Sequence, residues 1–152
     1  MSDDFPVMLP PKRLFRVVAG QDPLALPTGR ADGPCDDPAS WRMLHLFASR
    51  RGAMAAALAR SGGAIPPGWV VADLRCEDRR PFLDARDPAR LPPALAALLA
   101  SGECRALAER ADEAGLAGVA LPSPDAPSQI VFALLDPVAA RPLAPPKPVS
   151  PH

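Results

Sequence analysis

The sequence contains no tyrosine, only two histidines and three cysteines, and its only lysines are Lys12 and Lys147. Aromatic residues make up 5% of the 152 residues, so the core must consist mainly of small and aliphatic side chains. The sequence also lacks basic residues interleaved with aromatics, the pattern typical of a surface that binds single-stranded nucleic acid. We therefore expect no direct contact with nucleic acid.

Excess charge of either sign is also missing, because 17 lysines and arginines balance 17 acidic residues. A neutral chain has no general attraction to nucleic acid or to acidic membranes. No apolar run approaches the ~20 residues that a membrane-spanning helix needs. The N-terminus lacks the basic and apolar regions of a signal peptide. These absences predict a cytoplasmic protein without membrane contact.

Motifs for metal and nucleotide sites are absent as well. The cysteines, Cys35, Cys76 and Cys104, are odd in number and far apart, and His45 and His152 add no ligand cluster. We therefore expect reduced thiols and no metal site. There is no glycine-rich dinucleotide loop, no phosphate loop and no Gly-x-Ser-x-Gly elbow of a serine hydrolase.

The length is sufficient for one domain with a real core. We expect a flexible lead-in at residues 1–11, a single domain at 12–144 and a proline-rich tail at 145–152. The last sixteen residues, 137–152, contain six prolines and are expected to build no packed element.

Hydrophobic patterning places strands and helices between these ends. The order predicts an α+β or mixed α/β domain around a small mixed sheet with packed helices. A long loop, residues 21–40, separates the first two strands. Strands are expected at 14–19, 41–47, 68–76, 82–84, 116–121 and 130–135, and helices at 50–60, 93–100 and 103–113.

Three residues of the first half are candidates for a binding site. Arg16 interrupts an apolar strand, so it either faces solvent or enters a cleft, where its planar group suits a phosphate or a carboxylate. Arg30, in the long loop, is a second anion-binding group or a solvated side chain. His45 is either a satisfied buried histidine or a pocket wall.

The fourth candidate is Ser123, which follows the strand that ends at Pro122. It is either a binding hydroxyl beside the core or a plain turn residue. Because Pro122, Pro124 and Pro127 lack the donor that a sheet ladder needs, we expect no regular pairing between the strands on either side of this turn.

These features occur in an order that resembles the RES-domain family, the toxins of type II toxin–antitoxin pairs. The similarity extends over roughly residues 13–144. The matching segments are Leu14-Phe15-Arg16-Val17, Gly29-Arg30, Arg42 to Ser49, Gly115 to Ser123 and Val131 to Pro137.

The resemblance implies an ADP-ribosyltransferase-like fold and degradation of NAD by phosphorolysis. It implies that NAD is a substrate or ligand rather than a permanently bound cofactor. It also implies a helix-turn-helix antitoxin as partner. Whether the protein forms a homo-oligomer stays an open question. In this comparison Arg16 and Ser123 match the catalytic arginine and serine. Arg30 matches a second arginine and His45 replaces a tyrosine, so both belong to the NAD-binding set.

The glutamate of the family falls on Ala56, or on Ala57 if the helix is shifted by one residue. No glutamate precedes Glu77, so no small shift restores it. Cleavage of the nicotinamide bond develops positive charge on the ribose, and loss of a stabilising group of this kind costs on the order of a hundredfold in rate.

Three hypotheses follow from this substitution. The chain is an active NAD-degrading protein, a catalytically inactive nucleotide- or partner-binding domain of the same descent, or an unrelated small α+β interaction module.

Overall fold

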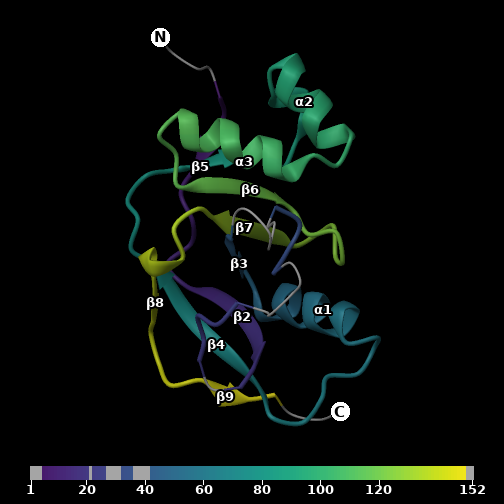
Figure 1. Cartoon of the computed structure of the whole chain (residues 1–152), viewed down its shortest axis with the longest axis vertical. Coiled ribbons are helices and arrows are strands. Elements are labelled where there is room, and N and C mark those ends of the chain that lie inside the picture. Colours follow the sequence, from purple (N-terminus) through teal and green to yellow (C-terminus); the bar gives the residue numbers. More distant parts are fainter. Residues whose placement is uncertain (1–4, 21, 27–31, 36–41, 150–152) are drawn as a thin grey trace.

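The computed structural model describes residues 5–20, 22–26, 32–35 and 42–149. The chain is α+β, as predicted, and within these ranges nine strands form one mixed sheet with helices packed against it (Figure 1). The strand order is β1-β5-β6-β7-β3-β2-β4-β8, and β9 pairs with β4. Of these pairs, only β5 with β6 is parallel. The strands are β1 (Val7–Met8), β2 (Leu14–Ala19), β3 (Leu44–Phe47), β4 (Trp69–Cys76), β5 (Phe82–Asp84), β6 (Gly118–Pro122), β7 (Ile130–Leu134), β8 (Ala140–Pro142) and β9 (Lys147–Pro148).

The described residues also form three α-helices and two short 3-10 turns. Helix α1 packs against β2 and β3, whereas α3 packs against β6 and carries α2 on its outer side (Figure 1). None of the helices in the described part of the chain is long and apolar enough to cross a bilayer. The helical segments are α1 (Arg50–Arg60), η1 (Pro88–Arg90), α2 (Pro93–Ala100), α3 (Cys104–Glu113) and η2 (Pro137–Ala139).

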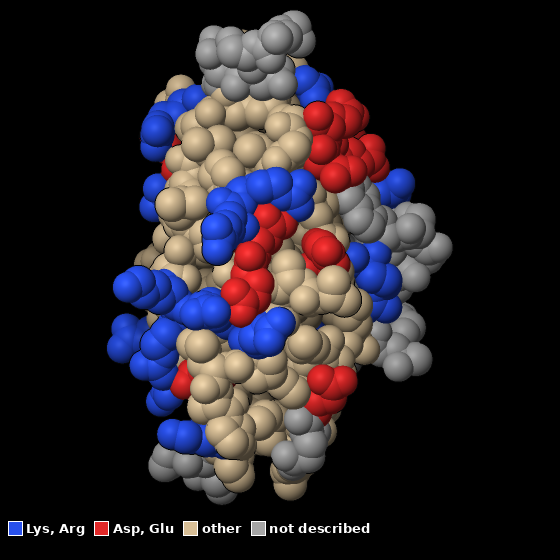
Figure 2. Space-filling model, turned by 90° about the vertical axis from the view of Figure 1, so that its left-hand side faces the viewer, with Lys and Arg blue, Asp and Glu red and all other residues tan. Residues whose placement is uncertain are grey.

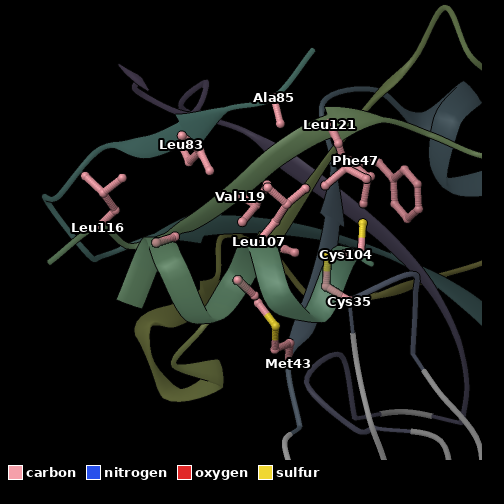
Figure 3. Packing of buried hydrophobic residues seen from close by; sticks show 14 of the residues in the cluster. Cys35, Met43, Phe47, Leu83, Ala85, Cys104, Leu107, Leu116, Val119 and Leu121 are labelled. Carbon is pink, nitrogen blue, oxygen red and sulfur yellow. The ribbon is translucent and has the colours of Figure 1, made fainter. Parts of the chain in front are cut away.

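Buried side chains form two clusters, one on each face of the sheet. Side chains along residues 43–47 point to alternate faces: Met43 and Phe47 belong to the helix-side cluster, and Leu44 and Leu46 belong to the other. Figure 3 shows the helix-side cluster, in which Leu107 of α3 points toward Val119 of β6. The second cluster has little helical cover and includes Phe82 and Phe132, whose rings meet edge to face at 5.2 Å.

The last two predicted strands pair with each other, contrary to the expectation from the prolines. β6 and β7 form an antiparallel ladder from Gly118 opposite Leu134 to Pro122 opposite Ile130. Pro122 is the final residue of β6, and Pro124 and Pro127 lie in the connecting turn, so the prolines border the ladder without interrupting it.

The expectation that no element forms after residue 136 is also wrong. β8 pairs with β4 from Leu74 opposite Pro142 to Cys76 opposite Ala140, and β9 pairs with Val70 and Val71 of the same strand. At the other end, β1 pairs with β5, so part of the expected lead-in is an edge strand. Prolines are tolerated here because these are short outer strands.

Surface charges lie in mixed positive and negative groups. On the face in Figure 2, positive and negative side chains lie interspersed, as the neutral composition suggests. Exposed ion pairs join Arg75 and Arg141 to Glu77, and Arg80 to Asp78. Each such pair contributes little to stability because water screens it.

Candidate functional site

The adjacent strands β2 and β3 separate after a single pair of partners, Phe15 opposite Phe47. This register would place Val17 opposite His45 two residues further along the ladder. The side chain of Asp32 lies there instead, and its Oδ2 accepts the His45 backbone N–H at 2.7 Å. The carboxylate of a loop residue thus replaces the strand partner that β3 would otherwise need.

Arg16 binds the same carboxylate from β2. Its guanidinium donates to Asp32 Oδ1 and, at 2.9 Å, to the carbonyl of Pro23, and the residue is 2% exposed. Arg16 therefore does not face solvent. It is a buried cation held by a buried anion, the arrangement that makes burial of either charge tolerable.

His45 is buried on the other side of Asp32. Its Nε2 accepts the backbone N–H of Cys35 at 3.2 Å, so the ring proton resides on Nδ1, which lies 3.4 Å from Asp32 Oδ2. A Cβ on Gly33 would clash with the imidazole ring, so only glycine lets the loop pass this close. The imidazole thus fixes the short segment 32–35.

Arg60, in the last turn of α1, completes the cluster. Its guanidinium donates to the carbonyls of Val17 at 3.0 Å and Asp32 at 3.2 Å, and it lies 3.9 Å from the Asp32 carboxylate. The Val17 carbonyl is the second backbone group that the separation of β2 and β3 leaves without a ladder partner. Two side chains from outside the sheet, those of Asp32 and Arg60, therefore provide the hydrogen-bond partners that the backbones of β3 and β2 lack here.

These contacts keep Asp32 ionised. Burial raises the pKa of its carboxyl, but the hydrogen bond from His45 and the positive charge of Arg16 outweigh burial and lower the pKa from 3.8 to about 2. At neutral pH the cluster consists of one carboxylate between two guanidinium groups.

A cavity of about 230 Å³ lies beside this cluster, between α1, the segment 32–34 and the turn after β6. Ser123 and Ala56 both line it, together with the side chain of Arg60. Its remaining wall is mostly apolar, formed by Phe47, Val131, Pro34 and Pro124, with Asp32, Gly33 and Asp125 completing it.

Ser123 is held rigidly at the edge of this cavity. The residue is 1% exposed, its backbone N–H donates to Gln129 at 2.8 Å, and its Oγ accepts the backbone N–H of Asp125 at 3.4 Å. Ser49, which caps α1, donates its hydroxyl to the Gln129 side chain. The start of helix α1 and the Ser123 turn are thereby joined.

The predicted site residues separate into three groups. Ser123 and Ala56 line the cavity, whereas Arg16 and His45 lie behind Asp32 and do not line it. Arg30 lies outside the described residues. The proposed roles of these residues in binding or catalysis stay predictions.

Sequence reasoning missed Asp32 and Arg60. Arg60 marks only the end of a predicted helix, and Asp32 stands in a loop with other acidic residues, so neither has a local pattern that indicates burial. Within the described ranges, no group of three histidine, cysteine, aspartate or glutamate side chains is arranged to hold a metal ion.

Comparison with known proteins gives a structural match but no sequence match. No protein-family model matches the sequence, and no curated protein matches it significantly. Among solved structures, the chain is similar to the toxin in the crystal structure of the M. tuberculosis MbcT–MbcA toxin–antitoxin complex. The match has a TM-score of 0.62 at 16% sequence identity and covers 95% of this chain and 87% of that chain. The protein therefore has the fold of a toxin from a toxin–antitoxin complex, built from a largely different sequence.

Proposed function

We propose that this protein is a toxin-like partner in a toxin–antitoxin pair and that its cavity binds the nicotinamide end of NAD. One observation carries the proposal: on a toxin fold, one cavity brings together Ser123, Ala56 and Arg60, two of which the RES-domain resemblance assigns to the site. The same reasoning favours an ADP-ribosyltransferase-like arrangement of the sheet and α1.

The size and lining of the cavity suit one end of a dinucleotide. Cavities that enclose drug-sized ligands measure about 300–1,000 Å³, and this cavity of about 230 Å³ is smaller. It matches a flat nicotinamide ring packed against Phe47 and Val131, with its amide near the Ser123 hydroxyl. The remainder of the dinucleotide would lie outside.

Charges of both signs lie at the cavity. Arg16 and Arg60 face the ionised Asp32, and Asp125 is a second carboxylate in the lining. Arg60 lines the cavity with a side chain that is 23% exposed, and its planar guanidinium suits a phosphate of the dinucleotide.

Turnover of NAD should be slow because α1 presents a methyl group where a carboxylate would stabilise the ribose cation. Asp32 already binds Arg16 and His45, and Asp125 lies at the exposed rim. We therefore propose binding with weak catalysis, rather than efficient NAD degradation.

Calorimetric titration with NAD tests the binding part of the proposal. Ser123→Ala should weaken binding by about tenfold, the cost of one lost hydrogen bond to the ligand. The exposed Ser128, changed to alanine, should leave the affinity unchanged. Absence of heat with the wild-type protein would contradict the proposal.

A gain-of-function variant tests the catalytic part. Ala56→Glu places a carboxylate in the cavity and should raise nicotinamide release by about a hundredfold or more in the presence of NAD and phosphate. Ala59→Glu is the matched control, because Ala59 is exposed on the same helix. Equal rates in both variants would show that this position is not beside the reacting bond.

The second candidate function is a catalytically inactive nucleotide- or partner-binding module, favoured by Ala56 itself. NAD binding without turnover in either variant would support this alternative. The antitoxin part is tested in cells: expression of the Ala56→Glu variant alone should arrest growth, and co-expression with the product of the adjacent gene should relieve the arrest.

A further inference from the structure

Two cysteines far apart in the sequence lie side by side beneath α3. Cys35 is fully buried and Cys104 is 8% exposed, and both belong to the helix-side core cluster. A hydrogen bond joins their thiols, and Figure 3 shows the two sulfur atoms near one another at the start of α3. Both side chains are reduced thiols in this structure.

Position favours Cys104 as the reactive member of the pair. It is the first residue of α3, and the side chain of the preceding Glu103 makes no capping hydrogen bond. Backbone N–H groups at a helix N-terminus stabilise a thiolate. The hydrogen bond from Cys35 likewise lowers the pKa of the Cys104 thiol, although burial raises it.

Cys104 is also the accessible member. It lines an open hollow of about 310 Å³ together with Pro34, Glu103 and Arg105. Cys104 therefore borders solvent, whereas Cys35 is fully buried. Cys76, the third cysteine, lies on β4, and burial raises the pKa of its thiol.

We propose that Cys35 and Cys104 form a redox modification site that hydrogen peroxide converts to a disulfide in the folded protein. The Cys104 thiolate attacks the peroxide, the O–O bond breaks and the leaving hydroxide takes a proton to form water. The Cys35 sulfur then attacks the resulting sulfenic acid, the S–O bond breaks and a second water leaves. Two thiols supply the two electrons that reduce one hydrogen peroxide.

The bond would tether one wall of the cavity. Cys35 follows directly after Asp32, Gly33 and Pro34, all of which line the cavity beside Ser123. Oxidation would attach this segment covalently to α3, whereas in the reduced protein it is held by hydrogen bonds to His45 and Arg16. The proposal does not rest on NAD binding, because it concerns two thiols and an oxidant.

Peptide mapping of the full-length protein after hydrogen peroxide treatment tests the site. We expect a Cys35–Cys104 linked peptide, reversed by dithiothreitol, with Cys76 still open to alkylation. Cys76→Ser should leave this result unchanged, and Cys104→Ser should leave Cys35 reduced. Linkage to Cys76, or oxidation of Cys104 that never proceeds to a disulfide, would overturn the proposal.

Thermal unfolding gives an independent measurement. A native disulfide that closes a long loop should raise the melting temperature by about 5 °C or more relative to the reduced protein. The Cys104→Ser variant should show no shift after the same treatment. A lower melting temperature on oxidation would show that the bond requires distortion, which contradicts a preformed site.

Discussion

At the scale of single residues, one carboxylate organises the candidate site. Asp32 takes the place of a strand partner for His45, neutralises Arg16 and lies against the cavity that Ser123 and Ala56 line. Its burial is tolerable because the groups that contact the carboxylate are donors or cations. The same contacts make the stability of the protein depend on the ionisation of this group.

We expect Asp32 to make the protein sensitive to acid in a defined pH range. Its pKa is lowered from 3.8 to about 2 on folding, so its ionised form stabilises the folded state at and above pH 4. This contribution, about 2 kcal/mol, should disappear as the pH falls from about 4 through about 2. Urea unfolding at a series of pH values measures it.

Comparison with Asp32→Asn isolates this residue from other carboxylates. The variant leaves Arg16 buried without its anion and should lose about 3 kcal/mol at pH 7. The difference from wild type should shrink as the pH approaches 2. Asp125→Asn, at the exposed rim, should match wild type throughout; a loss in Asp32→Asn that does not change with pH would refute the assignment.

At the scale of elements, the β6–β7 hairpin presents the candidate serine. Its ladder is unusually close at Gly118, where a Cβ would collide with the carbonyl of Ala133 on the neighbouring strand. The hairpin ends at Pro122, so Ser123 begins the turn immediately beyond the last paired residue. A change in the ladder therefore displaces the serine at its end.

Gly118→Ala should destabilise the protein by about 3 kcal/mol, because backbone rather than a flexible side chain occupies the required space. Gly102→Ala is the contrast: no atom lies within 4 Å of its Cβ position, and its φ of +76° alone should cost about 1 kcal/mol. Urea unfolding measures both. Equal losses would show that crowding at Gly118 is relieved by a small strand shift.

At the scale of the whole molecule, local patterns predicted most elements and missed long-range pairing. The α+β class, the helices and the faces of β3 follow from hydrophobic periodicity. The pairing of β6 with β7, and of β8 and β9 with β4, does not follow from periodicity. The presence of prolines in a segment does not show whether they lie within a ladder or at its ends. Likewise no local signal places Asp32 between β2 and β3, since its partners come from distant segments.

The C-terminal strands should protect the sheet from self-association. β8 and β9 pair along β4, whose other side is paired with β2. A chain that ends at Ala139 exposes this edge of β4 and should form dimers or larger species by light scattering. A chain that ends at Ala144 keeps β8 and should show a smaller effect. Two monomeric truncations of wild-type stability would contradict this role.

The position of Asp32 between two strands also limits how the protein can evolve. The residue that would contact a ligand in the cavity is the one that satisfies His45 and Arg16 in the sheet. Selection for altered specificity at this position would therefore yield poorly folded variants. Adaptive change is expected to accumulate instead at Ala56 and Asp125, whose side chains do not hold the strands together. Ala56 is also the position at which the sequence already departs from the family that it resembles.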